Sequence, residues 1–331
     1  MPNRATIEQL AAWLKAQDDI VLLGHINPDG DAVGSNFALW HALRAMGKRA
    51  VVCLPGGPVK QYLGIAPGSE TALDPADDLP FAPKTALAVD VSEYERLGEA
   101  GMALFDACRN HAVLDHHATN PGFGEIYVLD GDAAAAGELV VDLIDALGAG
   151  LSPEAAACLF VAISTDCGNF NFPSTRAQTF RAAAKCVEAG ASVDELTRRL
   201  YRERSLAETR LMAAILGDLT LSADGHVAWA RLTQDMFREA GATWADNVNI
   251  VNYLLQVQGV RIAVLAEQRG ADVTKFSLRA NPPWNVARDV AVPLGGGGHD
   301  CAAGVTLPLP LEEALQQVLA RAIEASEEGR A

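Results

Sequence analysis

The chain has 331 residues, more than one hydrophobic core usually organises, so we expect two domains. Half of the residues are hydrophobic and 21% are charged, which is typical of a globular protein with ample apolar material to bury. The formal net charge of −16 argues against a long basic groove of the kind that tracks nucleic acid. An anionic substrate would have to be attracted locally, by bound cations or by a few arginines.

The N-terminal segment lacks the uninterrupted apolar core of a signal peptide, and no apolar run approaches the roughly 20 residues that span a bilayer. Six cysteines are scattered without a CxxC pair. This pattern argues against a thiolate zinc site and against a disulfide framework. We therefore expect a cytoplasmic protein with reduced thiols and no membrane partner.

The first half of the chain alternates strand-like and helix-like segments. Residues 20–25 (IVLLGH) form a short apolar run, and apolar side chains then recur at helical spacing from residue 31 to Gly47. Further strand candidates lie at residues 49–54, 84–90 and 111–117. Continuous apolar strands separated by helices predict a parallel sheet covered on both faces.

Three of these candidate strands end in polar side chains. They run into His25, into Asp90, and into the triplet Asp115-His116-His117. In parallel sheets, ligands gather beyond the carboxyl ends of the strands. These side chains are therefore candidates for a common site.

Residues 151–172 predict a helix with Ser152 as its N-cap, Pro153 in its first turn and Gly168 at its stop. Asp166 falls in the last turn of this helix. The helix dipole disfavours a carboxylate there by about 0.3–1 kcal/mol. A bound cation would offset this cost.

The pattern of predicted helices and strands changes in the second half of the chain. Residues 176–217 read as helical throughout, and the arginines within 197–210 are typical of a solvated helix face. Strand candidates follow at residues 226–232, 260–268 and 273–280. We predict a catalytic domain over residues 1–195, a helical linker over 196–220, and a smaller α/β domain over 221–331.

The stretch HINPDGDAVGS (25–35) has two interpretations. Asn27-Pro28-Asp29-Gly30 is ordinary turn chemistry, but His and Asp are also metal ligands. The rest of the chain supplies partners, and the proposed site contains His25, Asp29, Asp31, Asp90, His116 and Asp166. Four crowded carboxylates would repel one another unless cations neutralise them. Oxygen and imidazole donors favour Mn²⁺ or Mg²⁺, with Zn²⁺, Co²⁺ and Fe²⁺ as alternatives.

With these motifs in place, the sequence resembles the DHH phosphoesterases, a family named for the triplet at 115–117. HINPDGDAVGS, AVD (88–90), DHH and STDCGNFNFPST (164–175) are similar to its four catalytic motifs. KFSLRA (275–280) and GGGGHDCAAG (295–304) are similar to its glycine-rich C-terminal domain. Five motifs in order make the resemblance specific, and the length and the glycine loop most resemble its NrnA-type branch.

The resemblance implies two divalent cations, with Mn²⁺ favoured and Mg²⁺ as the alternative, and a shared Asp90. One cation would be held by His25, Asp29 and Asp90, and the second by Asp31, Asp90, His116 and Asp166. Two such metals, about 3.5–4 Å apart, could hold a hydroxide for in-line attack on phosphorus. The expected catalytic residues are His117, Asp90 and Asp31. His117 would assist the leaving oxygen without binding a metal, and Asp115 would orient the histidines.

In the C-terminal part, the expected substrate-binding residues are Arg279, Gly296, Gly297, Gly298 and His299. Glycine backbone can approach an anion closely, and Arg279 can form bidentate bonds to phosphate. A cleft between the metals and these groups would suit a substrate with two phosphates and would limit its length.

Two features depart from the family pattern. Cys167 stands where a threonine is usual, and we expect it to place a soft ligand near the metals. The loop containing Pro282, Pro283 and Trp284 follows the expected phosphate-binding arginine, and we expect it to shape specificity. Phe172 and Trp284 are candidates for stacking on a base, whereas core packing is favoured for Phe170.

The resulting functional prediction is a metal-dependent phosphoesterase. It would hydrolyse short oligonucleotides to mononucleotides and remove the 3′-phosphate of adenosine 3′,5′-bisphosphate. One alternative is a phosphodiesterase for linear or cyclic signalling dinucleotides, and another is a nucleotide sensor without catalysis, which retention of all six ligands disfavours. A homodimer remains open.

Overall fold

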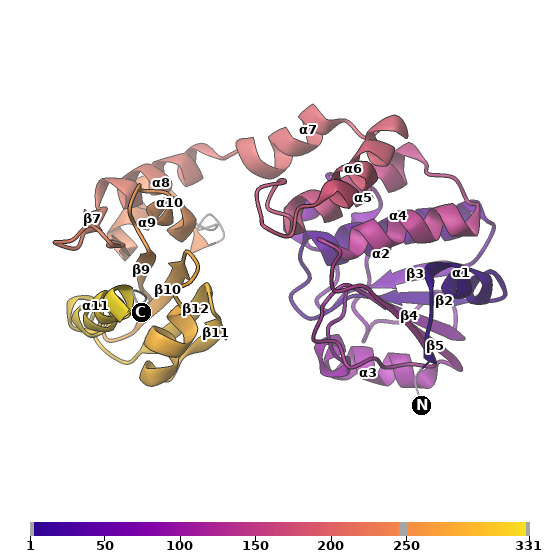
Figure 1. Cartoon of the computed structure of the whole chain (residues 1–331), viewed down its shortest axis with the longest axis horizontal. Coiled ribbons are helices and arrows are strands. Elements are labelled where there is room, and N and C mark those ends of the chain that lie inside the picture. Colours follow the sequence, from indigo (N-terminus) through magenta and orange to yellow (C-terminus); the bar gives the residue numbers. More distant parts are fainter. Residues whose placement is uncertain (1–2, 245–249, 329–331) are drawn as a thin grey trace. The chain divides into compact units, whose positions relative to one another are not determined.

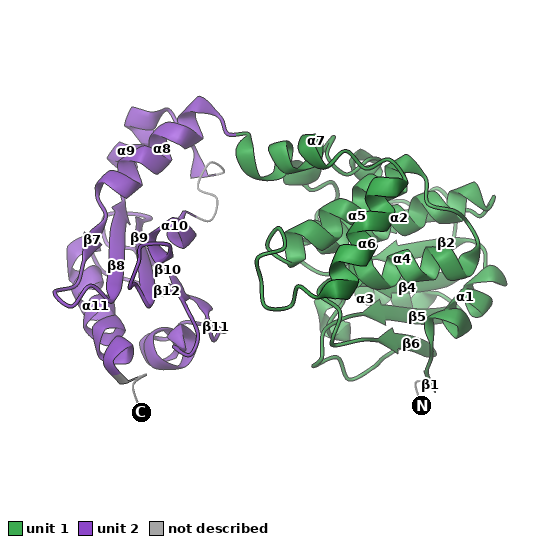
Figure 2. Cartoon of the chain, turned by 45° about the horizontal axis from the view of Figure 1, so that its top comes forward, with its two compact units in different colours: residues 1–203 green, residues 204–331 purple. Residues whose placement is uncertain are grey.

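The computed structural model describes residues 3–244 and 250–328. The chain divides into two compact units, residues 1–203 and 204–331, which Figure 2 shows in green and purple. Within the described ranges, no helix combines the length and the apolar character needed to cross a membrane.

The first unit is built around a six-stranded sheet. The strands are β1 (Asn3–Arg4), β2 (Ile20–Leu23), β3 (Ala50–Cys53), β4 (Thr85–Val89), β5 (Asn110–Asp115) and β6 (Ile126–Leu129). The α-helices are α1 (Ile7–Lys15), α2 (Gly30–Ala45), α3 (Gly98–Ala107), α4 (Ala136–Leu147), α5 (Pro153–Asp166), α6 (Ala177–Glu188) and α7 (Val193–Thr197). Short 3₁₀ turns η1 (Lys60–Tyr62), η2 (Ser69–Thr71) and η3 (Tyr94–Leu97) and the π-helical turn η4 (Arg198–Arg202) complete it.

Every strand pair in this sheet is parallel, in the order β1-β6-β5-β4-β2-β3. This confirms the predicted parallel sheet. From β2 the chain moves to β3 on one side and to β4, β5 and β6 on the other. The carboxyl ends of β2 and β4 therefore lie at the switch point where such sheets form a binding crevice.

Side chains alternate across the sheet, so each strand supplies two cores. Leu22 and Leu87 pack with α1, α2, α4 and α5, whereas Val21 and Ala86 pack with Phe105 of α3. Figure 1 shows α3 on the face opposite to α2, α4 and α5. Apolar residues on both faces explain why these strands read as uninterrupted apolar runs.

The second unit contains a mixed sheet in the order β11-β12-β10-β9-β8-β7. Its strands are β7 (Thr220–Leu221), β8 (Val227–Leu232), β9 (Ile262–Gln268), β10 (Thr274–Ala280), β11 (Gly297–His299) and β12 (Ala302–Leu307). Its helices and turns are α8 (Leu206–Gly217), α9 (Gln234–Ala240), α10 (Val251–Leu255), α11 (Leu311–Glu328), the π-helical turn η6 (Ala287–Ala291) and the 3₁₀ turn η7 (Val292–Leu294). Only β8 and β9 pair in parallel among these described strands.

The prediction of a continuous helix over residues 176–217 is wrong in detail, because several separate helices occupy this range. Gly190, with a φ of +108°, follows the end of α6, and the chain is again non-helical at Glu203, which has an extended backbone. The glycine-rich loop was also incompletely predicted, because it contributes β11 and leads into β12. Glycine lowers strand propensity, so the pattern gave no strand signal there.

Candidate active site

The HINPDGDAVGS segment begins α2, and Asp29 is the N-cap of that helix. Its Oδ1 accepts hydrogen bonds from the backbone N–H groups of Asp31 (3.0 Å) and Ala32 (3.1 Å). Asn27 has a φ of +56°, a left-handed conformation that asparagine tolerates. Asp29 therefore caps a helix, and this helix start places Asp29 and Asp31 near the ends of the strands.

Close packing of α2 on α5 brings Asp31 and Asp166 together. A Cβ at Gly30 would lie 2.3 Å from Thr165 Oγ1, and a Cβ at Gly34 would lie 2.3 Å from the Cys158 carbonyl oxygen. Only glycine permits this approach at these two positions. The spacing of the motif thus sets the distance between two helices as well as the positions of its aspartates.

The carboxylate of Asp31 is held by the N-terminus of α4. Its Oδ2 accepts from the N–H of Ala136 at 2.6 Å, and its Oδ1 accepts from Gly137 N–H at 3.0 Å and from Ser35 Oγ at 2.8 Å. Helix N-termini favour negative charge because their first N–H groups lack helical partners. This contact was not predicted from the sequence. A usable signal was present, because α4 begins after Ala135, which has no side chain to cap the helix.

Asp90 lies at the end of β4 in a left-handed conformation, with a φ of +61°, which is rare outside glycine. Its Oδ2 lies 3.7 Å from His25 Nε2, and its Oδ1 lies 3.5 Å from His116 Nε2. Oδ1 is buried and has no hydrogen-bond partner among the described residues. A buried carboxylate oxygen without a partner is costly unless a cation satisfies it.

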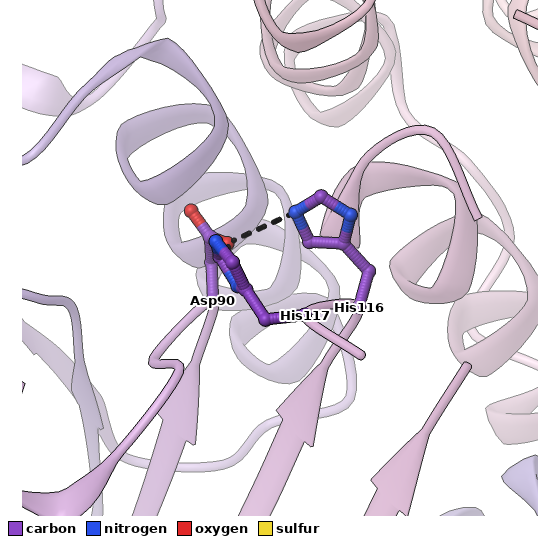
Figure 3. Close-up of side chains that lie close together, drawn as sticks. All are labelled: Asp90, His116 and His117. Carbon is purple, nitrogen blue, oxygen red and sulfur yellow. Dashed lines mark ion pairs between the residues drawn. The ribbon is translucent and has the colours of Figure 1, made fainter. Parts of the chain in front are cut away.

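The structure brings all six predicted ligands together. Ligand atoms within 4.8 Å of one another form three groups: His25, Asp29 and Asp90; Asp31, His116 and Asp166; and Asp90, His116 and His117. Figure 3 shows Asp90 beside the two neighbouring histidines, with the contact from Asp90 to His116 dashed. Asp90 belongs to two of these groups, whereas the group of Asp31, His116 and Asp166 is linked to it through His116.

Two histidines present Nε2 to the carboxylates and bond through Nδ1 to the backbone. His25 Nδ1 lies 2.8 Å from the Ile26 carbonyl oxygen, and His116 Nδ1 lies 3.2 Å from that of Ala133. Such a bond keeps the proton on Nδ1 and leaves Nε2 free to bind a metal. The expectation that Asp115 orients the histidines holds for His117 alone.

His117 Nδ1 lies 2.8 Å from Asp115 Oδ1, and Asn120 Nδ2 donates to the other oxygen of that aspartate at 2.7 Å. The hydrogen bond to Asp115 raises the pKa of His117. With Nδ1 engaged, the half-exposed ring has Nε2 available to a substrate. Asn120 was not predicted, because an Asn five residues past the aspartate of a motif carries no distinctive signal.

The charges in the cluster conflict without a cation. Burial, followed by the neighbouring Asp90 and Asp166, raises the pKa of Asp31 well above its usual value. Burial also raises the pKa of Asp166 to about 6. Burial disfavours the protonated form of His116, yet Asp90 and the other carboxylates raise its pKa to about 10. The unpartnered Asp90 oxygen and this crowding show that the donor set fits divalent cations.

Cys167 does not belong to these metal-capable groups in the described residues. Its side chain is fully buried, and Sγ accepts from the N–H of Phe170 at 3.2 Å. Burial raises the pKa of its thiol. The expected soft ligand near the metals is therefore not what the geometry shows, and Cys167 instead supports the turn after Asp166.

In the second unit, Arg279 lines a cavity of about 310 Å³ together with Trp244, Glu267, Arg269, Lys275 and Ser277. Its guanidinium donates to the carbonyl oxygen of Leu278, at 2.9 Å, and to no carboxylate in the described residues. Burial lowers the pKa of Arg279. The buried Glu267 pairs with Arg269 and accepts from Ser277 Oγ, so Lys275 and Arg279 keep their charges facing the cavity.

The strand register places His299 on the same face of the sheet as Arg279, because both lie opposite Ala302. Close packing of the backbone explains why glycine is needed at two positions of the glycine-rich loop (295–298). A Cβ at Gly296 would lie 2.3 Å from the Gly304 carbonyl oxygen, and one at Gly298 would lie 2.5 Å from that of Ala302. Gly297 alone of these three faces open space.

The three aromatic residues considered for base stacking have different environments. Phe170 packs on Phe160 and stacks on Phe180, which confirms its expected packing role. Trp284 donates to the Ser326 carbonyl oxygen at 3.2 Å and lies under Arg261, so it packs against α11. Phe172 is 54% exposed and remains a candidate for base stacking.

Comparisons with known proteins agree with this geometry. The model of the DHH family, N-terminal domain, matches residues 19–163, and that of the DHHA1 domain matches residues 224–328. The bifunctional oligoribonuclease and PAP phosphatase NrnA of Thermus thermophilus is 36% identical over 313 residues, covering 94% of this chain and 91% of that protein. The protein of the same name from Bacillus subtilis is 25% identical over 302 residues, covering 90% and 92%.

A solved structure agrees as well. The crystal structure of an exopolyphosphatase-related protein from Bacteroides fragilis superposes with a TM-score of 0.87 and 25% sequence identity, covering 98% of this chain and 97% of that one. Both domain models, the relatives and the fold point the same way. The chain belongs to the DHH family and combines a DHH-family N-terminal domain with a DHHA1 domain.

Proposed function

We propose that this protein is a metal-dependent phosphoesterase that hydrolyses short oligonucleotides to mononucleotides and removes the 3′-phosphate of adenosine 3′,5′-bisphosphate. The observation that carries the proposal is the buried Asp90 carboxylate, whose two oxygens face His25 on one side and His116 on the other. The names of the NrnA relatives, which match over most of the chain, support the substrate class.

Two overlapping ligand sets are proposed, the second of which joins Asp90 to a group that it contacts through His116. His25, Asp29 and Asp90 would hold one cation, and Asp31, Asp90, His116 and Asp166 would hold the other. Two imidazoles among the donors favour Mn²⁺ over Mg²⁺, which prefers oxygen ligands. When bound, the cations supply an activated water and polarise the phosphoryl oxygens.

His117 is the proposed proton donor to the leaving oxygen. Asp115 accepts from Nδ1 and fixes the ring, so a proton on Nε2 points away from Asp115. Asn120 donates a hydrogen bond to the other oxygen of Asp115 and so helps to fix the position of the His117–Asp115 pair. This arrangement resembles a general acid positioned by a buried carboxylate.

Arg279 is proposed to hold a phosphate that does not react, and His299 and the backbone at Gly297 are proposed to assist. The half-buried guanidinium lacks a carboxylate partner in the described residues and faces a cavity that also contains Lys275. Guanidinium groups bind phosphate oxygens in a bidentate manner. A substrate with two phosphates is the class that this cavity suits.

A substrate panel tests the function. The metal-free protein, supplied with Mn²⁺, is assayed on adenosine 3′,5′-bisphosphate, RNAs of two to five nucleotides, cyclic dinucleotides and pyrophosphate. We expect turnover of the bisphosphate and the short RNAs that chelation abolishes and Mn²⁺ restores. Turnover of cyclic dinucleotides alone would establish the signalling alternative. Full activity after exhaustive chelation would refute the metal-dependent mechanism.

A further inference from the structure

Arg96 reaches the candidate active site from η3, the turn that follows β4. Its backbone carbonyl accepts the N–H of Ile26 at 2.8 Å, which ties together the loops after β2 and β4. Gly98, with a φ of +73°, lets the chain turn here, since a Cβ would lie 2.9 Å from Ile26 Cγ2. Arg96 is thus held at the switch point of the sheet.

The guanidinium of Arg96 lies against His25. Its Nη2 is 3.3 Å from His25 Nδ1, but that nitrogen is also 2.8 Å from the Ile26 carbonyl oxygen. With Nε2 turned toward Asp29 and Asp90, Nδ1 carries the proton and donates it to Ile26. Two N–H donors cannot bond to each other. The contact with His25 therefore leaves the guanidinium without an acceptor.

No carboxylate among the described residues forms an ion pair with Arg96. Other arginines in this chain have such partners: Arg231 pairs with Asp218 at 2.7 Å, and Arg49 pairs with Asp19. Arg96 is only partly buried, so its guanidinium, which has no carboxylate partner in the described residues, stays accessible. The guanidinium therefore has donors that an anion from outside the chain can use.

We propose that Arg96 binds the reacting phosphoryl group of the substrate by donating its guanidinium N–H groups to a non-bridging oxygen. The proposal rests on the proposed function and adds a group that was not predicted. It gives the two arginines separate tasks, because Arg279 holds the phosphate that does not react. A preorganised cation beside the reacting phosphorus stabilises the charge that develops on these oxygens.

Inorganic phosphate is the probe, because it binds without turnover. Its affinity for the Mn²⁺-loaded protein is measured by calorimetry and as inhibition of bisphosphate hydrolysis. We compare the wild-type protein with Arg96→Ala and Arg96→Lys, and with Arg109→Ala as the matched control. Arg109 is exposed and lies just before the amino end of β5. The candidate active site lies at the carboxyl ends of the strands, so Arg109 is on the opposite side.

We expect Arg96→Ala to weaken phosphate binding about tenfold to a hundredfold. Arg96→Lys should recover part of this loss, because it restores the charge without the bidentate fork. Arg109→Ala should match the wild-type protein. The increase in Tm on adding Mn²⁺ should be the same in all four proteins, because Arg96 is not a ligand.

Two outcomes overturn the proposal. Unchanged phosphate affinity in Arg96→Ala shows that the guanidinium does not bind the anion. Loss of the Mn²⁺-induced Tm increase shows that Arg96 instead positions His25. If Arg96→Ala does not fold, Arg96→Gln carries the same measurements. Failure of the wild-type protein to hydrolyse any substrate in the panel refutes the proposed function, while phosphate binding still decides the role of Arg96.

Discussion

The two units place their polar side chains in different ways. In the first unit, the site residues follow the ends of parallel strands and the ends of α2 and α5, and His25, Asp31 and Asp90 are buried. In the second unit, Lys275, Ser277 and Arg279 project from the face of β10 and alternate with the buried Phe276 and Leu278. One site is formed by strand ends and the other by a strand face.

This difference determines how each site should respond to substitutions. Residues at the strand ends lie in loops with specific backbone conformations, such as the left-handed conformation of Asp90. Face residues depend on register, because Lys275 lies opposite Glu267 and Arg279 opposite Ala263. We therefore expect substitutions in the first unit to affect chemistry and metal binding, and those in the second to affect substrate affinity.

The largest effect should follow from Asp90→Asn. Because Asp90 is proposed to contact both cations, the variant should lose nearly all turnover and most of the Mn²⁺-induced rise in Tm. Without metal, the same variant should be more stable than the wild-type protein, because it removes a buried charge that repels Asp31. Thermal melts with and without Mn²⁺ measure both changes.

Asp78→Asn is the matched control, since Asp78 is exposed and belongs to none of the motifs. It should melt like the wild-type protein under both conditions. An unchanged metal-induced shift in Asp90→Asn would show that Asp90 does not bridge the cations.

His117→Ala should act on chemistry alone. As a general acid, His117 should contribute about 10²–10⁴-fold to kcat, and the variant should still bind both metals. An aryl phosphate, whose good leaving group needs little protonation, should be the less affected substrate. Steady-state kinetics and metal analysis test this together. Loss of one metal from the variant would make His117 a ligand, as its place beside Asp90 and His116 allows.

Arg279→Ala should have a smaller effect, and mainly on KM. A group that holds the substrate and the transition state equally raises KM when removed and leaves kcat unchanged. We expect KM for adenosine 3′,5′-bisphosphate to rise about tenfold to a hundredfold, with little change for an aryl phosphate. Arg210→Ala, an exposed position on α8, is the control. Equal KM values in both variants would remove Arg279 from substrate binding.

The smallest effects should come from the glycine loop. Gly298→Ala should lower the free energy of unfolding by about 1–3 kcal/mol, because a Cβ would crowd the Ala302 carbonyl and Gly298 has a φ of +143°. Gly297→Ala should change it by less than about 0.5 kcal/mol, because nothing lies within 4 Å. Denaturant unfolding measures both. A raised KM in a stable Gly297→Ala would support backbone contact with substrate, whereas equal stability losses would contradict the packing argument.

The sequence predicted the parallel sheet because its strands are apolar on both faces and end at histidine and aspartate. It also predicted that the six candidate ligands lie together, because parallel strands converge at their carboxyl ends. It did not predict β12 or the break at Gly190, since glycine and alanine carry weak strand and helix signals.

The supporting groups of the site could not be predicted for another reason. Ala133, Ala136 and Gly137 contribute backbone carbonyl and N–H groups that every residue except proline possesses, so their identities reveal little. Arg96 is one arginine among many in the sequence, and only the fold shows that it lacks a carboxylate partner in the described residues. The cavity around Arg279 likewise depends on the register of β9 and β10.

The hydrogen bonds from α4 to Asp31 have a consequence for how this protein can be monitored. The N–H groups of Ala136 and Gly137 open only when the carboxylate of Asp31 moves or the first turn of α4 frays. A cation that immobilises Asp31 therefore also slows the exchange of these two protons with deuterated solvent. We therefore expect hydrogen exchange at the start of α4 to report metal occupancy from a position outside the proposed ligand set, without substrate and without a spectroscopic label.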